Sequence, residues 1–195
     1  MEMATQATLG RREQILEAAL RLIGRSGRQA VTHRAVAEEA GVPLGSTTYY
    51  FDSRDDLLAQ ALEYVAAEEI ERYGRLGGEL RHVRSGRELA DRLIEELVAA
   101  ARDRVAYTAE YELWLEAGRR PELREAAQNW CDAEQRAVAG ALEDLGSSDP
   151  AADASLVVAA IDGLGERVLA REEDPAQAAR EFRPELRRLI ERLLG

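Results

Sequence analysis

The sequence predicts an all-α protein, and three observations lead to this prediction. Apolar residues recur at i, i+3 and i+4 along most of the chain, as on one face of a helix. No segment shows the strict alternation of a half-buried strand. Residues that start and stop helices separate the apolar stretches. At 195 residues and 46% hydrophobic residues, the chain can bury a core. We expect three small helices and then a larger helical bundle, about nine helices in all.

The first helix is predicted over residues 12–23, where apolar side chains fall on one face. Gly24 and Gly27 follow directly and are typical of the C-terminal stop of a helix. Residues 1–10 lack the basic start and the apolar stretch of a secretory signal. We therefore expect a disordered lead-in there.

Two short helices follow, joined by a turn that contains a glycine. Thr32 is predicted to cap a helix over residues 33–40, and Gly41 to close it. Pro43 suits the first turn of the next helix because its fixed φ angle matches the helical value. That helix reads Gly-Ser-Thr-Thr-Tyr-Tyr and so carries many hydroxyl and phenol groups.

Longer helices are predicted for the rest of the chain. Ser53 and Ser85 each have an acidic residue three positions later, which is typical of a capping box. Asp-Pro pairs at 149 and 174 combine a capping acid with proline at the first helical position. Glycines thin out the helical pattern over 74–86, where we expect a loop or a frayed helix end. The expected helices cover residues 54–73, 85–101, 104–118, 121–145, 150–171 and 175–194.

Composition limits the class of protein. The net charge is −11, but residues 1–55 hold seven Arg and seven acidic residues, so the excess of acid lies in the remainder. The acidic total therefore does not exclude DNA binding by the N-terminal part. A single cysteine, Cys131, excludes an intramolecular disulfide and a multi-cysteine metal site. No apolar run approaches the length of a membrane span, so a cytoplasmic location is expected.

Residues 32–58 carry the functional prediction. A helix, a short glycine turn and a second short helix are typical of a helix-turn-helix, whose second helix enters the DNA major groove. A buried core helix would not be polar along most of its length, as the second helix is here. A helical corner without any ligand is the alternative interpretation.

Residues from about 12 to 62 resemble the N-terminal domain of the tetracycline-repressor (TetR) family of bacterial transcription regulators. The resemblance covers about a quarter of the chain with high specificity. It implies an all-α homodimer that binds a palindromic operator in double-stranded DNA, and a C-terminal bundle that binds a small effector and thereby releases the DNA. It rests on the amphipathic first helix, on Val36-Ala-Glu-Glu-Ala-Gly-Val42, on Gly45, on Tyr49-Tyr-Phe51 and on Ser53-Arg-Asp-Asp-Leu-Leu58.

The resemblance also implies which residues meet the DNA. Arg34 and Arg54 would contact phosphate, and the short side chains at 46–48 could reach base edges or a thymine methyl. The family commonly has an aliphatic residue and then a tyrosine where this chain has threonines, and often a lysine where this chain has a leucine. These departures bear on the choice of operator. The predicted DNA-binding residues are Thr32, His33, Arg34, Pro43, Leu44, Gly45, Ser46, Thr47, Thr48, Tyr49, Tyr50 and Arg54.

An effector pocket is expected between about residues 62 and 145. Four aromatic residues stand out there in a chain with 5% aromatics, and a glutamate lies among three of them. Aromatic rings with a carboxylate could hold a cationic or aromatic ligand. Aromatics at helical spacing can equally be core. The predicted effector-binding residues are Tyr107, Glu110, Tyr111, Trp114 and Trp130.

The last two predicted helices carry wide apolar stripes that something must cover. They either pack within their own bundle or form a twofold dimer interface. A helix-turn-helix protein has a reason to dimerise, because two half-sites raise specificity. The predicted interface residues are Leu156, Val157, Ala160, Ile161, Leu164, Val168, Phe182, Leu186, Leu189 and Leu193.

These observations predict a homodimeric transcriptional repressor that a small molecule releases from its operator. Residues 11–53 would form the DNA-binding domain, and 54–195 the effector and dimerisation domain. An enzyme is disfavoured by two histidines, no Glu-x-x-His pair, no phosphate loop and no nucleophile motif; no cofactor or metal is predicted. A helical ligand-binding or scaffold protein with lost or weak DNA binding, or an activator, remains an alternative. No motif identifies the effector, the operator or the regulated genes.

Overall fold

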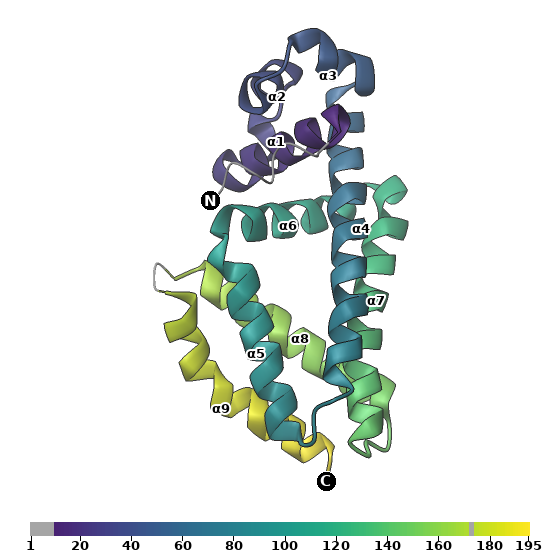
Figure 1. The fold of residues 1–195 in the computed structure, drawn as a ribbon, viewed down its shortest axis with the longest axis vertical. Coiled ribbons are helices and arrows are strands. Elements are labelled where there is room, and N and C mark those ends of the chain that lie inside the picture. The colour runs from purple at the N-terminus through teal and green to yellow at the C-terminus, as the bar shows by residue number, and fades with distance from the viewer. Residues whose placement is uncertain (1–9, 172–173) are drawn as a thin grey trace. The chain divides into compact units, whose positions relative to one another are not determined.

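The predicted fold class is confirmed by the computed structural model, which describes residues 10–171 and 174–195. Within these residues the regular structure consists of helices alone (Figure 1). The predicted lead-in lies outside the described residues, apart from Gly10. The elements are α1 (Arg11–Ser26), η1 (Arg28–Ala30), α2 (His33–Ala40), α3 (Leu44–Tyr50), α4 (Arg54–Leu80), α5 (Gly86–Arg102), α6 (Arg104–Ala117), η2 (Pro121–Leu123), α7 (Arg124–Asp144), α8 (Pro150–Leu169) and α9 (Pro175–Leu193).

The chain divides into two compact units that do not follow the order of the sequence. The first unit runs up to Ala66 and also contains Val105–Ala127. The second contains Ala67–Arg104 and Gln128–Gly195. Most of α6 therefore packs with the N-terminal helices, although the sequence predicts a division after residue 53. The physical reason is long-range contact between α6 and the start of the chain, which periodicity does not reveal.

The core of the first unit forms where α1 packs against α2 and α3. The predicted apolar face of α1 is confirmed, because Ile15, Leu16 and Ile23 are fully buried. Phe51 follows α3 and is also buried, which anchors the end of that helix in the core. Burying side chains of this size stabilises a fold by about 1.5–3 kcal/mol each. This core holds α3 in place while leaving one of its faces exposed.

The predicted helix starts are confirmed by their hydrogen bonds. Thr32, Ser53, Ser85 and Asp149 each accept a hydrogen bond from the backbone N–H three residues later, over 3.0–3.2 Å. Asp174 accepts one from the N–H two residues later, over 3.0 Å. Each cap satisfies a backbone N–H that has no partner within its helix. Local chemistry therefore sets where these five helices begin.

Two predicted helix ends are wrong. Helix α1 continues past Gly24 to Ser26, and Gly27, with φ of 73°, makes the stop. Helix α4 continues through the glycines that were expected to end it and stops at Leu80. Gly77 packs closely on α7, since a Cβ there would lie 3.2 Å from the Cα atom of Ala137. Tertiary packing thus keeps in the helix a segment whose intrinsic helix propensity is poor.

The second unit is built around α5, α8 and α9, which lie side by side (Figure 1). The buried face of α9 includes Phe182, Leu186 and Ile190. Asp91 on α5 accepts hydrogen bonds from Arg183 and Arg187 of α9, over 2.8 and 2.9 Å. Apolar burial and these ion pairs together fasten α9 to α5. None of the helices in the described part of the chain is long and apolar enough to cross a membrane.

Candidate functional site

The turn between α2 and α3 is the first part of the candidate site. Gly41 adopts the left-handed conformation, with φ of 65° and ψ of 35°, which is favourable for glycine because it lacks a Cβ atom. The N–H of Val42 donates to the carbonyl oxygen of Ala37 over 2.9 Å, and the Val42 side chain is buried. The turn therefore sets the direction in which α3 leaves α2, as a helix-turn-helix requires.

Thr47 does not belong to the exposed surface of α3, so the DNA contact predicted for its side chain is corrected. Its side chain is fully buried, with 0% exposed. Its hydroxyl donates to the carbonyl oxygen of Leu44 over 2.8 Å and lies 3.3 Å from the carbonyl oxygen of His33. Thr47 therefore fastens α3 to the start of α2. A side chain enclosed in this way cannot reach a base.

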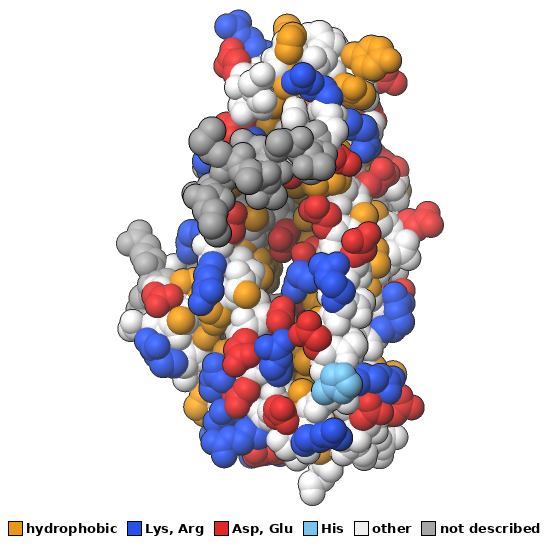
Figure 2. Space-filling model, viewed as in Figure 1, with side chains coloured by type: hydrophobic (Ala, Val, Ile, Leu, Met, Phe, Trp, Pro, Cys, Tyr) orange, Lys and Arg blue, Asp and Glu red, His pale blue; other side chains and the backbone are white. Residues whose placement is uncertain are grey.

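The other residues predicted on α3 form one accessible surface. Tyr49 is 81% exposed and Leu44 is 50% exposed. Tyr50 is also exposed and meets Tyr49 edge to face, with ring centroids 5.0 Å apart. Pro43, Gly45 and Thr48 are exposed, and Ser46 is half-buried. Figure 2 shows apolar side chains standing on the surface at the α2–α3 end of this unit. We define the α3 face as Leu44, Gly45, Ser46, Thr48, Tyr49 and Tyr50.

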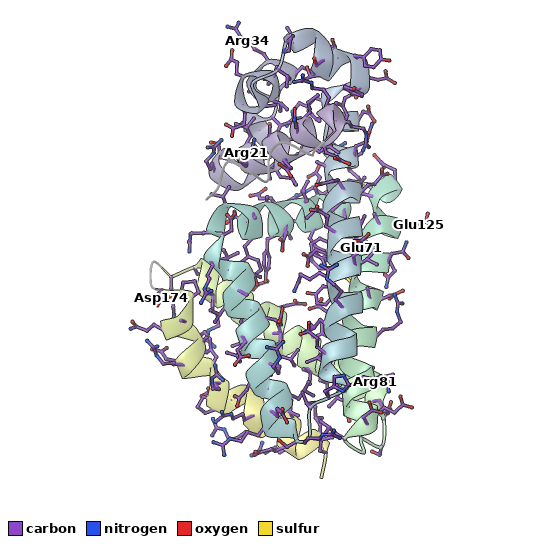
Figure 3. The ribbon with its side chains drawn as sticks, viewed as in Figure 1. Arg21, Arg34, Glu71, Arg81, Glu125 and Asp174 are labelled. Carbon is purple, nitrogen blue, oxygen red and sulfur yellow. The ribbon has the colours of Figure 1, made fainter. Side chains whose placement is uncertain are left out.

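The residues predicted on α2 lie beside this face in different environments. Arg34 projects from α2 into solvent (Figure 3), with 83% of its side chain exposed, and pairs with Glu38 over 3.0 Å. Thr32 is exposed and uses its hydroxyl oxygen as the helix cap. His33 is half-buried, and its Nδ1 atom is enclosed by protein. Among the residues predicted to bind DNA, Arg34 is therefore the cation that is most accessible to a phosphate.

Arg54 has a structural role that the sequence did not reveal. Its Nε donates to the carbonyl oxygen of Val31 over 2.8 Å, and its Nη2 donates to that of Arg28 over 2.7 Å. These bonds tie the start of α4 to η1 and to the residue before the cap of α2. About a third of its side chain remains exposed. The predicted phosphate contact stays a prediction, and it would have to be made through the remaining N–H groups.

A buried carboxylate connects α6 to the segment before α2 and to the start of α4. The sequence did not reveal it. Glu116 is 4% exposed and accepts hydrogen bonds from Arg28 over 3.3 Å and from Arg120 over 2.8 Å. Arg120 also donates to Asp55 on α4 over 2.8 Å. Burial alone would raise the pKa of Glu116, but the hydrogen bond from Arg120 and the charges of Arg28 and Arg120 outweigh it, so the pKa is lowered. The spacing of Glu116 to Arg119 and Arg120, at i+3 and i+4, was a sign of this network in the sequence.

The predicted effector residues are divided between the two units. Tyr107, Glu110, Tyr111 and Trp114 lie on α6 in the first unit, and Trp130 lies on α7 in the second. Tyr107 and Tyr111 meet edge to face at 5.2 Å between ring centroids, and their hydroxyl oxygens are 3.4 Å apart. Tyr107 and Trp130 are buried, whereas Trp114 is exposed. Their role in effector binding stays a prediction.

An acidic cluster in the second unit was also missed. We define it as Glu69, Arg72, Tyr73, Glu134 and Asp162, on α4, α7 and α8. The Arg72 Nε lies 3.0 Å from each carboxylate oxygen of Glu69, and its guanidinium lies 4.4 Å from the centroid of the Tyr73 ring. The Tyr73 hydroxyl donates to Glu134 over 2.9 Å.

The environment of this cluster disfavours negative charge. Burial and then the charge of Asp162 raise the pKa of Glu134 to about 7. Desolvation by the surrounding protein and then the charge of Glu166 raise the pKa of Asp162 to about 6, although its side chain keeps accessible surface. Strongly shifted carboxylic acids are enriched at functional sites, where burial and neighbouring charges shift pKa values. On the visible face of this unit, basic and acidic side chains are intermixed (Figure 2).

The predicted dimer residues separate into two groups. Val157, Val168, Phe182 and Leu186 are buried within a single chain, so they are removed from the predicted dimer surface. They cover the core of their own unit, which is the alternative that the sequence left open. Leu156 is 55% exposed. The remaining predicted residues are partly exposed: Ala160, Ile161, Leu164, Leu189 and Leu193.

Family models match most of the chain. Residues 15–61 match the model described as bacterial regulatory proteins, tetR family. Residues 84–195, more than half of the chain, match the model described as tetracyclin repressor-like, C-terminal domain. The first match contains α2, the turn and α3, and the second contains α5 to α9.

Solved structures and curated relatives agree with these matches. The crystal structure of multidrug binding protein EbrR complexed with ethidium is 34% identical and covers 93% of this chain and 99% of that chain, with a TM-score of 0.67. A putative transcriptional regulator from Saccharomonospora viridis in complex with choline is 28% identical, covers 92% of this chain and 95% of its own, and has a TM-score of 0.74. The HTH-type transcriptional repressor KstR of Rhodococcus jostii is 41% identical over 76 residues, which are 39% of this chain and 34% of that protein. The chain thus spans about a third of the length of the curated relatives it matches.

Proposed function

The chain belongs to the tetracycline-repressor (TetR) family, and we propose that it is a cytoplasmic transcriptional repressor that binds a palindromic operator as a homodimer. A small-molecule effector would release it from the DNA, and no catalytic role is assigned. The α3 face carries this proposal, because it is the exposed side of the second helix of a helix-turn-helix, the helix that enters the major groove. Residues 11–53 would bind DNA, and residues 54–195 would bind the effector and the second copy.

The dimer surface is proposed on the exposed part of α8 and α9. Leu156 is a large apolar side chain that a single chain leaves half uncovered. Ile161, Leu164, Leu189 and Leu193 also keep accessible surface. Apolar side chains of this kind are stabilised when a second copy removes them from water. Two copies would then place two α3 helices on successive half-sites.

Selection of DNA sites by the purified protein tests the proposal. We expect a palindromic consensus, bound tightly by the wild-type protein and lost on Tyr49→Ala, because this ring is the most exposed on the α3 face. Glu71→Ala is the matched control, since Glu71 is exposed on α4 in the second unit. Absence of enrichment at low salt would favour the alternative of a helical ligand-binding or scaffold protein. Transcription in vitro from the selected site separates a repressor from an activator.

We propose that the effector is an organic cation. Ethidium and choline, which the two related structures bind, are both cations. The acidic cluster supports the same class here, because a cation offsets the cost of ionising Glu134 and Asp162. The Tyr73 ring already faces one cation, the Arg72 guanidinium. Aromatic ring faces attract organic cations of this kind.

Ethidium affinity is expected to rise as the pH increases from 6 to 8. The pKa of Glu134 is about 7, so its carboxyl changes from mostly protonated to mostly ionised over this interval. Because the pKa of Glu134 is raised above its unfolded value, ionisation of this carboxyl destabilises the ligand-free protein as the pH rises towards 7. A bound cation stabilises the ionised carboxylate and offsets that cost, so the affinity for the cation rises with pH. Fluorescence titration with ethidium checks the expectation at each pH.

Two variants make this test specific. Glu134→Gln is expected to reduce the pH dependence above pH 6.5, because an amide does not ionise and Asp162, with a pKa of about 6, is already mostly ionised there. Glu125→Gln is the control, since Glu125 is exposed on α7 (Figure 3) and its loss should leave the wild-type profile. A Glu134→Gln protein that keeps the full pH dependence would contradict the role of this carboxylate.

A further inference from the structure

The α3 helix lacks the side chains that read bases through paired hydrogen bonds. It comprises Leu44–Tyr50, with the sequence LGSTTYY, and it contains no Arg, Lys, Asn, Gln, Asp or Glu. Two-point recognition of guanine needs Arg or Lys, and that of adenine needs Asn or Gln. If this helix lies in the major groove, it has to obtain sequence information from other groups.

The threonine hydroxyls of α3 are already engaged. Thr47 is fully buried and bonded to backbone carbonyls. Thr48 is exposed, but its hydroxyl donates to the carbonyl oxygen of Gly45, one turn back, over 3.3 Å. The hydrogen of the Thr48 hydroxyl is therefore used within the helix. Its γ-methyl group is the part of the side chain that has no polar partner to satisfy.

Leu44 and Thr48 form one apolar patch on α3. They are four residues apart, so their side chains are neighbours on the same side of the helix. Both are exposed, and half of the Leu44 surface is accessible. An apolar surface of this kind gains free energy when it leaves water against another apolar group. In the major groove the C5-methyl of thymine is the apolar group on the base edges.

We infer that the α3 helix reads its operator through thymine methyl groups, which Leu44 and Thr48 contact. The inference rests on the proposed DNA-binding function and specifies the kind of base that the helix selects. Arg34, the exposed cation beside this face, would contact phosphate, and such contacts fix position but carry little sequence information. The half-sites should contain thymine where these two side chains lie.

Deoxyuridine substitution in the selected operator tests the inference without altering the protein. Deoxyuridine keeps the hydrogen-bonding edge of thymine and removes only the methyl group. At the contacted positions, each substitution is expected to weaken binding about fourfold, and about fifteenfold when both half-sites are changed. Thymines outside the half-sites are the internal control and should tolerate the change. Replacing a contacted T·A pair by C·G should weaken binding, and 5-methylcytosine at that position should restore part of it.

Protein variants assign the contact to its atoms. Thr48→Val keeps the methyl group without the hydroxyl, and it should retain both affinity and discrimination against deoxyuridine. Thr48→Ser keeps the hydroxyl without the methyl, and it should lose discrimination at one position. Leu44→Ala should lose discrimination against deoxyuridine at a different position of the half-site. Circular dichroism confirms that each variant remains folded, which is expected because both residues are exposed.

The outcomes separate this inference from the proposed function. A palindromic operator bound equally well with deoxyuridine throughout its half-sites would overturn the inference and leave DNA binding intact. The inference is also overturned, with DNA binding intact, if Thr48→Ser binds the operator normally while Thr48→Val does not. In that case the hydroxyl group, and not the methyl group, would read the base. If selection yields no operator at all, the proposed function fails and the inference with it.

Discussion

Replacing Gly24 by alanine is expected to destabilise the N-terminal unit by about 3 kcal/mol or more and to abolish DNA binding. A Cβ atom at Gly24 would lie 1.9 Å from the backbone oxygen of Val105 and 2.9 Å from its Cγ1 atom. The obstacle is the main chain at the start of α6, which cannot turn aside as the end of a flexible side chain can. Overpacking usually costs about 1–3 kcal/mol, and a clash with backbone belongs at or above the upper end of that range. The contact between α1 and α6 would have to open.

Urea unfolding and an operator-binding assay measure this effect. Gly74→Ala is the matched control, because Gly74 is also a helical glycine and a Cβ there meets nothing within 4 Å. The control is expected to be neutral or to gain up to about 1 kcal/mol from helix propensity. If Gly24→Ala unfolds within about 0.5 kcal/mol of the wild type, an amount typical of surface substitutions, α1 and α6 do not approach this closely in solution.

Replacing Glu116 by alanine is expected to destabilise the same unit by about 2–4 kcal/mol. The substitution removes the shared partner of Arg28 and Arg120, whose guanidinium groups are mostly covered by protein. Leaving the covered charge of Arg28 without this partner is costly because the protein no longer replaces its lost hydration, whereas Arg120 keeps its hydrogen bond to Asp55. DNA affinity should fall as well, since Arg28 also holds Arg54 through its carbonyl oxygen. Glu125→Ala is the control, because Glu125 is exposed.

The acid sensitivity of unfolding distinguishes ionisation of Glu116 from simple packing. The pKa of Glu116 is lowered in the folded protein, so this carboxylate contributes stability above its unfolded pKa of about 4.3. That contribution is lost as the pH falls through the lowered, folded value. Glu116→Gln should therefore lose stability at pH 7 and change less than the wild type between pH 5 and pH 3. Parallel curves for the two proteins would contradict the assignment.

Features that depend on a few neighbouring residues could be predicted from the sequence. The caps at Thr32, Ser53 and Ser85 were predicted because a side-chain oxygen and the N–H groups that it satisfies lie within three residues of each other. The buried face of α1 followed from the helical period for the same reason. The exposed α3 face was predicted from its polar composition. The resemblance of residues 12–62 then indicated the family, to which the chain belongs.

Features that depend on contacts between distant residues could not be predicted. Thr47 and Thr48 are identical in type and adjacent in the chain, yet one is buried and the other exposed. The sequence did not reveal that Arg54 donates hydrogen bonds to two backbone carbonyls some 25 residues earlier. Four residues predicted at a dimer surface are instead covered within a single chain. In each case the deciding partner is remote in sequence.

The sequence by itself therefore determined that this protein is helical, where most of its helices begin, and where a helix-turn-helix corner with an exposed second helix lies. These depend on hydrogen bonds and periodicities that act over a few residues. Only the tertiary structure decided that α6 packs with α1 through Gly24, that Arg120 links Glu116 of α6 to Asp55 at the start of α4, and which threonine of α3 is exposed. The reason is that close approach and burial are set by how helices pack, and one residue type at one spacing is compatible with several packings.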